Sequence, residues 1–299
     1  MGSVLTPALL SAGHDVTVVD TMWFGNFLVP HPRLRVVQAD VRDTDALPLT
    51  NIEAIIHLAN IANDPSVELD PVVSWEINVL ATMQLADQAV RHGVRQFVFA
   101  SSGSVYGVKQ EDHVTENLTL VPISTYNKTK MVAERALLSY QNQMIVHCLR
   151  PATVCGYSPR MRLDVSVNML TMQALRDKRI TVFGGHQVRP NIHIQDMIAA
   201  YLHFLEHAIP SGCYNVGFEN LSLLEIADAV RAQVPADVVV TGADDPRSYR
   251  LNSDKLLATG FRPRHCVQDA VREIAAAVLA GRLQDDERWY NVKWMKKVL

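Results

Sequence analysis

The sequence predicts an α/β fold built on a doubly wound parallel sheet, with a smaller second lobe after it. Two observations support this prediction. Short runs of β-branched and apolar residues alternate with helical segments through the first half of the chain. These runs are apolar at nearly every position, as strands are when helices cover both faces of a parallel sheet. Crossovers of this length favour a Rossmann-type sheet.

The elements of the first half follow one another in a regular order. A first helix covers residues 5–12, where apolar residues recur at helical spacing, and Gly13 ends it as glycine commonly does after a helix. Longer helices are predicted at residues 73–92 and 126–140. The predicted strands lie at residues 15–20, 34–39, 54–59, 96–100 and 144–149.

The alternation becomes less regular after Arg150-Pro151, which predicts the second lobe. Neither an internal repeat nor a low-complexity linker separates the two halves, so we expect them to be tightly joined. The predicted elements of this part are helices at residues 165–176, 223–233 and 267–279 and strands at residues 180–183 and 237–241.

The composition is that of an ordinary globular protein and excludes several classes. The chain has 299 residues, of which 48% are hydrophobic and 20% charged, so it is neither disordered nor fibrous. A net charge of -3 and a pI near 6.4 lack the basic character of a nucleic-acid binder. Apolar runs stay far shorter than the about 20 residues that cross a bilayer, so we expect no membrane partner.

The cysteines and histidines predict a reducing environment and no metal. The 4 cysteines show neither C-x-x-C spacing nor a pairing framework, which indicates free thiols in a cytoplasmic protein. The start of the chain has no basic region followed by a cleavable apolar segment, so no signal peptide is expected. The 11 histidines contain no H-E-x-x-H pattern, and we predict no metal site.

One group of residues has the chemistry of a proton-transfer site. Ser101 and Ser102 end a predicted strand, and Tyr126 and Lys130 stand four residues apart at the start of a predicted helix, on one face of it. A lysine ammonium beside a phenol favours the phenolate and lowers the pKa of the tyrosine toward the range for proton transfer. Tyr-x-x-x-Lys also occurs by chance on solvated helix faces, but the Rossmann-like context favours the catalytic interpretation.

Several stretches, in order, resemble the landmarks of one family. They are FVFASSGSVYG, STYNKTK, LRPATVCGY, VRPNIHIQDMIAAY, YNVG and DPRSYRLNSDKLLATGF. In these stretches the chain resembles the extended short-chain dehydrogenases/reductases, the NAD-dependent nucleotide-sugar epimerase/dehydratase family. The resemblance implies an NAD-binding Rossmann domain over residues 1–160, to which about 190–218 return. It also implies a substrate-binding lobe from residues 161–189 and 219–299, with a nucleotide-diphosphate sugar as the substrate.

The resemblance assigns the catalytic roles. Tyr126 is implied as the base, and Lys130 as its pKa partner and as a ligand of the nicotinamide ribose. Ser102 is implied as the hydroxyl that bonds the substrate oxygen, because it lies four residues before Tyr106 of the VYG segment. Ser104 lies nearby and is expected to contact the sugar.

The cofactor residues start from Asp20. It ends a predicted strand where a dinucleotide fold binds the ribose 2′-hydroxyl, and its charge repels a 2′-phosphate, so NAD is favoured over NADP. The resemblance extends the NAD site to Asp40 and Val41 beside the adenine, to Leu58, Ala59 and Asn60 along the pyrophosphate path, and to Asn78, which would support the active-site strand. The family usually has alanine where this chain has Asn60. Each of these residues would also be ordinary in a turn or a core.

The start of the chain departs from the family pattern. The family begins with a strand and a Gly-x-x-Gly-x-x-Gly loop whose amides meet the cofactor pyrophosphate at a helix N-terminus. Gly2 matches only the last of these glycines. The chain is either a divergent protein without the loop or a sequence that begins at an internal methionine, and we favour the second. We expect the upstream DNA to encode a short strand and the missing glycines. A chain used as written should be marginally stable and bind NAD weakly.

Other residues are expected to hold the substrate or a second copy of the chain. Arg189 and Arg247 carry guanidinium groups that suit a diphosphate, and Asn168 is a further candidate for substrate binding. The helices near residues 73–92 and 126–143 carry apolar residues beyond a single stripe. The resemblance implies a homodimer in which these helices pair as a four-helix bundle.

The residues after the catalytic hydroxyl separate the possible reactions. The family's 4,6-dehydratases have an Asp-Glu pair there, and this chain has Gly103-Ser104. Without those acid–base groups we favour an epimerase that acts at C4 through a transient keto intermediate. A nucleotide-sugar dehydrogenase or 4-keto reductase, or a dehydratase, remains the alternative. A binding or regulatory protein of the same fold that lacks the cofactor loop is the non-enzymatic alternative.

Overall fold

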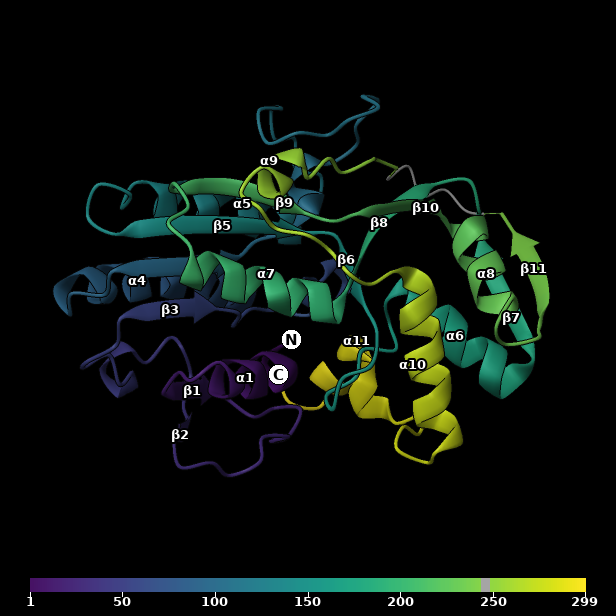
Figure 1. Ribbon diagram of the computed structural model, residues 1–299, viewed down its shortest axis with the longest axis horizontal. Helices are drawn as coiled ribbons and strands as arrows, with labels where there is room; N and C mark the ends of the chain where they lie inside the picture. The colour runs from purple at the N-terminus through teal and green to yellow at the C-terminus, as the bar shows by residue number, and fades with distance from the viewer. Residues whose placement is uncertain (243–247) are drawn as a thin grey trace.

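Parallel strands organise the first half of the chain, as Figure 1 shows. The computed structural model describes residues 1–242 and 248–299. The parallel strands of this half are β1 (Val16–Asp20), β2 (Leu34–Gln38), β3 (Ala54–His57), β4 (Gln96–Ala100) and β5 (Ile145–Pro151), and β9 (Gly212–Val216) joins them from later in the chain. The last four pair in the order β3-β4-β5-β9, and β1 pairs with β2. The predicted α/β fold with a parallel Rossmann-type sheet is confirmed.

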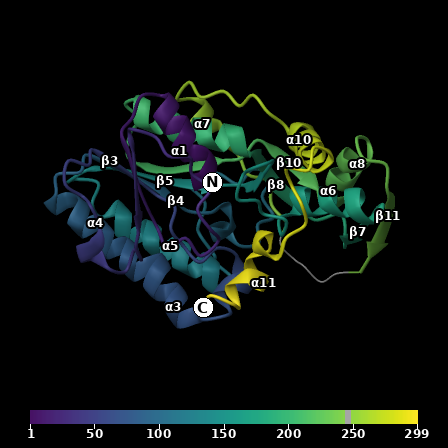
Figure 2. The ribbon, with the colours of Figure 1, turned by 90° about the horizontal axis from the view of Figure 1, so that it is seen from below.

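Helices cover both faces of this sheet. Figure 2 shows α4 (Ala81–Arg91) and α5 (Thr125–Leu138) on one side of the strands, with α1 (Gly2–Ser11) and α7 (Ile194–Glu206) on the other. Neighbouring residues of β4 alternate between the two sides. Phe97 and Phe99 pack with residues of α4 and α5, whereas Val98 packs with residues of α1 and α7. A strand that is buried on both faces therefore has apolar residues at nearly every position.

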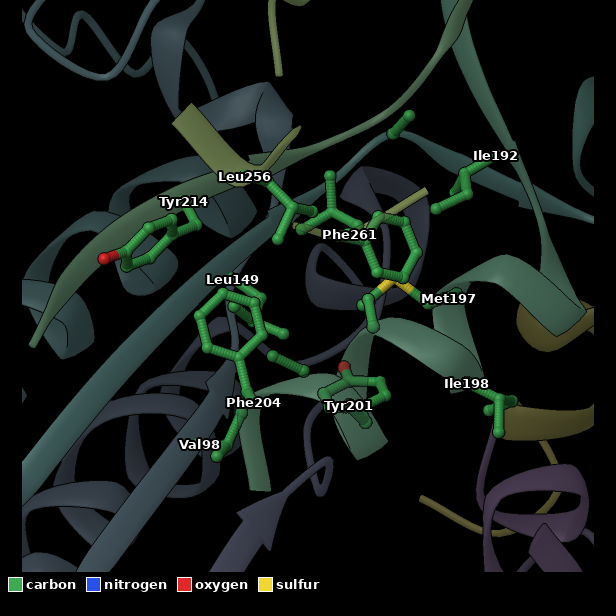
Figure 3. Close-up of a cluster of buried hydrophobic side chains, with 14 of the residues drawn as sticks. Val98, Leu149, Ile192, Met197, Ile198, Tyr201, Phe204, Tyr214, Leu256 and Phe261 are labelled. Atoms are coloured by element: carbon green, nitrogen blue, oxygen red, sulfur yellow. The ribbon is translucent and has the colours of Figure 1, made fainter. Parts of the chain in front are cut away.

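The core on the α7 side is the larger of these two clusters. Figure 3 shows Met197, Tyr201 and Phe204 of α7 pointing toward the side chains of β4, β5 and β9. The short helix α9 (Asp254–Leu257) closes the same cluster with Leu256. Residues from widely separated parts of the sequence thus share one core. This core packs against the strands whose carboxyl ends carry the candidate site.

The second lobe has its own core. Its strands are β6 (Thr153–Cys155), β7 (Arg179–Phe183), β8 (Val188–His193), β10 (Glu219–Ser222) and β11 (Asp237–Thr241). They pair as β10-β8-β6 and as β11-β7. Three helices pack around them, namely α6 (Ser166–Asp177), α8 (Leu223–Arg231) and α10 (Val267–Leu279). This lobe lies on the right of Figure 1.

The last helix returns to the first half of the chain. Met295 of α11 (Asn291–Met295) is buried in a cluster with Ile61, Val67 and Ile77. The Trp294 indole donates a hydrogen bond to the Trp23 carbonyl at 2.5 Å. Both α9 and α11 come from the range assigned to the substrate lobe, yet each contacts elements of the first half.

Most predicted elements, among them the helix end at Gly13, agree with the structure to within a few residues, but two details differ. The expected helix 73–92 is α3 (Pro71–Trp75), a π-helical segment over Glu76–Leu80 and α4. Gly13 follows α1 with φ +100°, as a glycine that ends a helix does. The sheet is divided between β1 and β3, which share no ladder among the described strands. None of the described helices combines the length and apolar character needed to cross a bilayer.

Candidate active site

The start of α5 places Tyr126 and Lys130 at the carboxyl end of the sheet. Ser124 caps this helix, since its hydroxyl accepts the Asn127 amide at 3.2 Å. The same hydroxyl donates to Asp64 at 2.5 Å, which holds the helix start against α2 (Asp64–Val67). A β-region cap with a short polar side chain is the usual way to begin a helix. The position of Tyr126 in the first turn therefore depends on Ser124.

Ser102 follows β4 and reaches the same place. Its hydroxyl accepts the Ser104 amide and lies 2.8 Å from the Ser104 hydroxyl, which in turn donates to the Asn127 side chain at 2.6 Å. A hydrogen bond also joins Ser102 to the Tyr126 side chain. The structure thus brings Ser102, Ser104 and Tyr126 together, as the sequence predicts, through one chain of hydroxyl and amide groups.

Burial controls the protonation of the phenol. Burial raises the pKa of Tyr126 to about 12, although the hydrogen bond with Ser102 and the positive charge of Arg162 lower it. A proton-accepting role needs this phenol to ionise more easily than that. A positive charge close to the phenol, such as that of a protonated Lys130, would favour the phenolate and supply part of the difference.

Lys130 lies beneath Tyr126 on the same face of α5. Its side chain is 1% exposed, and its ammonium nitrogen Nζ donates to the Ala100 carbonyl at 2.8 Å. Nζ lies 5.9 Å from the centre of the Tyr126 ring and 4.8 Å from that of Phe99. Burial lowers the pKa of Lys130 to about 7, and Glu134 acts in the opposite direction. The charge of this lysine is therefore finely balanced near neutral pH.

The first turn of α1 has the properties of an anion site. No side chain caps this helix, no acidic residue lies in its first turn, and a Cβ added at Gly2 would meet nothing within 4 Å. Burial lowers the pKa of the Met1 amine, and the charges of Arg160 and Arg162 lower it further, whereas Asp20 raises it. Uncapped helix amides beside guanidinium groups suit a diphosphate.

The remaining cofactor candidates lie at the ends of β1 to β3. Asp20 is exposed at the end of β1 and accepts the Met22 amide at 2.7 Å. The amide oxygen of Asn60 is buried without a hydrogen-bond partner, while its nitrogen donates to the Leu58 carbonyl. An open helix terminus, a strand-end carboxylate and an unpartnered buried acceptor together fit a dinucleotide such as NAD. Ala59 lies between Leu58 and Asn60 in the same segment.

Two further candidates have structural partners of their own. Asp40 forms an ion pair with Arg42, which lowers the pKa of Asp40, and Arg42 also contacts Glu76. Val41 follows Asp40 and packs against two hydrophobic clusters of the first half. Asn78 lies in the π-helical segment, and its side chain bonds both backbone groups of Ile61 and the hydroxyl of Thr129. Asn78 therefore joins the segment after β3 to α5.

The substrate candidates are spread around the second lobe. Asn168 of α6 accepts the Gly156 amide and donates to the Arg162 carbonyl, so it shapes the segment that carries Arg162. Arg189 lies on β8 and is partly buried. Arg247 lies outside the described residues.

Sequence reasoning missed three charged residues near the site. Arg162 acts on Tyr126 and forms an ion pair with Asp164, and Glu134 and Arg150 form a buried pair below Lys130. Charged side chains in an amphipathic pattern are usually solvated, so no feature of the sequence marks these three as buried or partly buried. The prediction of no metal site also overlooked the H-x-x-x-H spacing of His203 in α7 and His207, the C-cap of that helix; no described group of three His, Cys, Asp or Glu could hold a metal ion.

The comparisons with known proteins agree with this geometry. The model of the NAD dependent epimerase/dehydratase family matches residues 1–217. The chain is 27% identical over 297 residues to a UDP-glucose 4-epimerase of Lactobacillus helveticus, covering 89% of each protein. A solved UDP-glucose 4-epimerase of Thermus thermophilus in complex with NAD superposes with a TM-score of 0.81 at 25% identity, over 92% of this chain and 96% of that one.

A dehydratase has the same fold. The dTDP-glucose 4,6-dehydratase DesIV of Streptomyces venezuelae superposes with a TM-score of 0.84 at 23% identity, over 97% of this chain and 95% of that one. At this identity the likeness concerns the fold alone. The family match covers most of the chain, and the Ser–Tyr–Lys arrangement lies at the end of the sheet beside the cofactor candidates. The chain belongs to the NAD dependent epimerase/dehydratase family, and it is an enzyme whose cofactor is NAD.

Proposed function

We propose that the protein is a nucleotide-sugar epimerase that inverts C4 through a transient keto sugar. The observation that carries this proposal is the position after Ser102. A Cβ added at Gly103 would lie 3.1 Å from the Pro151 carbonyl and 3.3 Å from the Tyr249 hydroxyl, so a carboxylate side chain there would require these neighbours to shift. Ser104 follows it. Elimination of water therefore lacks its acid–base pair, whereas epimerisation needs none.

The chain's own residues have distinct roles in this proposal. Tyr126 accepts the proton of the C4 hydroxyl, and Ser102 holds the same oxygen by a hydrogen bond. The ammonium of Lys130 favours the phenolate of Tyr126. NAD, when bound, supplies the acceptor and donor of a hydride. An epimerase returns the hydride to the opposite face of the sugar ring, so no net oxidation occurs.

A nucleoside-diphosphate sugar is the proposed substrate. Relatives of this chain act on such compounds by name, the UDP-glucose 4-epimerases of Lactobacillus helveticus and Lacticaseibacillus casei among them. A solved structure of MoeE5 with UDP-glucose and NAD is 26% identical to this chain, with a TM-score of 0.80. Arg189 on β8 is proposed to bind the diphosphate, with Arg247, Asn168 and Ser104 as further contacts of the substrate.

The helices that face away from the sheet support a homodimer. Val72, Trp75, Leu80 and Met83 expose 67%, 37%, 50% and 41% of their area along α3, the π-helical segment and α4. The interval of five residues between Trp75 and Leu80 matches the wider turn of the π-helical segment that joins them. We propose that this face pairs with the same face of a second copy.

A product assay tests the reaction. Purified protein is incubated with NAD and UDP-glucose, UDP-galactose, dTDP-glucose or UDP-glucuronic acid, and products are read by mass spectrometry and NMR. Unchanged mass with altered couplings at C4 is the expected result. A product lighter by one water would indicate a dehydratase, and stoichiometric NADH would indicate a dehydrogenase; either result would overturn the epimerase proposal.

A further inference from the structure

The face of α5 that carries the candidate catalytic residues continues one turn further. Tyr126, Lys130 and Glu134 stand at successive intervals of four residues, so they lie along one side of the helix. Glu134 is 1% exposed, which is rare for a carboxylate. A buried acid directly below the lysine needs a physical explanation.

Glu134 is held by several donors. Arg150 of β5 donates to it through Nε at 2.9 Å and Nη2 at 2.8 Å, in a two-pronged ion pair. The hydroxyl of Ser101 donates to the same carboxylate. Arg150 also donates to the hydroxyl of Tyr106 at 2.8 Å, and Tyr106 donates to Asn215 of β9 at 2.8 Å. These contacts hold Glu134, and with it the active-site helix α5, against β5 and the end of β4, and Tyr106 extends the network to β9.

A structural role alone does not account for this pair. Taking two charges out of water costs several kcal/mol, and apolar residues of similar volume often stabilise a core at least as well. Ser101, which bonds Glu134, directly precedes Ser102 in the chain. Lys130 bonds the carbonyl of Ala100, one residue earlier. The pair is thus connected to all three candidate catalytic residues through α5 and the end of β4.

The pKa shifts of other buried groups near Lys130, Glu134 and Tyr126 favour the neutral form of each group. His57 of β3 has its pKa lowered to about 3 by burial and by Lys130, so its ring is uncharged at neutral pH. The pKa of Cys148 on β5 is raised, through its hydrogen bond with Cys213 of β9 and through burial. Burial raises the pKa of Tyr201 on α7, which lies beside Tyr126. Glu134 is therefore the charge that acts on Lys130, and Arg150 is the ion-pair partner of that carboxylate.

We propose that Glu134 is a positioning residue whose carboxylate keeps the ammonium of Lys130 charged, with Arg150 as the counter-ion that limits this effect. The inference rests on the proposed role of Lys130 in the epimerase reaction. It predicts opposite effects for the two members of the pair. Glu134→Gln leaves Arg150 as an unbalanced cation, whereas Arg150→Met leaves Glu134 as an unbalanced anion.

The test measures the protonation of Lys130 directly. Protein labelled with ¹³C at the lysine Cε is titrated by NMR, and Lys130→Met identifies the signal. Glu134→Gln should move the midpoint downward by about one pH unit or more, and Arg150→Met should move it upward. The double variant, which restores neutrality, should titrate near the wild-type midpoint. Glu53→Gln removes one member of the exposed Glu53–Arg95 pair and serves as the matched control without a shift.

Activity provides the second readout. The alkaline limb of the kcat profile should follow the NMR midpoint in each variant, with KM little changed, and Glu134→Asp should restore most of the activity. Midpoints that stay fixed, or that move in the same direction in both single variants, would overturn the proposal. Midpoints that move oppositely while the kcat profile stays unchanged would instead overturn the catalytic role of Lys130 and leave its coupling to Glu134 standing. The double variant keeps the test valid if an unbalanced single variant fails to fold.

Discussion

Single residues decide the chemistry of this site because burial works against the charges that the reaction needs. The same dry environment that raises the pKa of Tyr126 to about 12 lowers that of Lys130 to about 7. Each shift favours the neutral form of its group. Because the proposed reaction uses a phenolate beside an ammonium, hydrogen bonds and nearby charges have to compensate for burial.

Replacement of Tyr126 tests its role as the base. Tyr126→Phe removes the proton acceptor and keeps the ring, so kcat should fall by roughly 10²-fold or more while the fold is retained. The measurement is turnover with the substrate found by the product assay, together with the circular dichroism spectrum. Tyr140→Phe, which removes a hydroxyl after the end of α5, is the control and should keep its activity. Near-normal turnover of Tyr126→Phe would show that another group is the base.

Burial of Lys130 also predicts how stability depends on pH. Its pKa falls from 10.5 in the unfolded chain to about 7 in the folded one, so between these values the unfolded chain binds the extra proton. The wild-type protein should therefore gain stability as pH rises through this window. Lys130→Met lacks this dependence. The amount by which its free energy of unfolding exceeds that of the wild type should therefore shrink by about 2 kcal/mol between pH 7 and pH 9.

Urea unfolding of both proteins at the two pH values measures this difference. Lys128→Met, which replaces an exposed lysine of the same helix, should differ from wild type by the same amount at both values. If the free energies of unfolding of Lys130→Met and wild type differ by the same amount at both pH values, the low pKa assigned to Lys130 is contradicted.

Helix starts and strand ends are the elements that position the site. Ser124 both caps α5 and bonds Asp64, so Ser124→Ala should destabilise the protein by about 1 kcal/mol and also lower kcat, because Tyr126 lies in the first turn. Ser222→Ala removes the capping box of α8 in the second lobe and should cost similar stability without loss of kcat. Equal kcat values in the two variants would contradict a positioning role for the α5 cap.

The sequence predicts elements well where one period dominates, and less well where it does not. Strands β4 and β11 are buried or paired along their whole length, and their bounds agree with the prediction. Helix α7 was left out of the prediction, although its buried residues Met197, Tyr201 and Phe204 stand at i, i+4 and i+7 on one face, so the helical period was present there. The π-helical turn around Asn78 has no sequence signature, because one inserted residue leaves the apolar pattern nearly unchanged.

The candidate site divides in the same way. Tyr126 and Lys130 were identified because their spacing carries meaning on any helix, and Ser102 because it ends a strand. Glu134 and Arg150 were missed because their burial arises from the packing of α5 on β5, which no local pattern encodes. The roles of all the site residues stay predictions that the experiments above test.

The whole molecule depends on contacts between distant parts of the chain. Met295 near the end of the chain packs with Ile61 and Val67, and Asn168 of the second lobe supports the segment of Arg162 beside Tyr126. The active site therefore includes groups from both halves. A change in how the two halves pack would alter the surroundings of the catalytic phenol as well as those of the substrate candidates.

The exposed helix face predicts the assembly of the whole molecule. Leu80 and Met83 expose 50% and 41% of their area on the side of α4 that faces away from the sheet. Burying these apolar groups against a second copy would remove them from water, so Leu80→Glu together with Met83→Glu should convert a dimer of about 67 kDa, twice the 33.3 kDa chain, into monomers. Light scattering at micromolar concentration measures the mass. Leu279→Glu is the control, because Leu279 is 82% exposed at the end of α10, a helix that Figure 2 shows on the other side of the molecule from α3 and α4. A monomer mass for the wild-type protein, or a dimer that survives the double substitution, would show that this face does not form the interface.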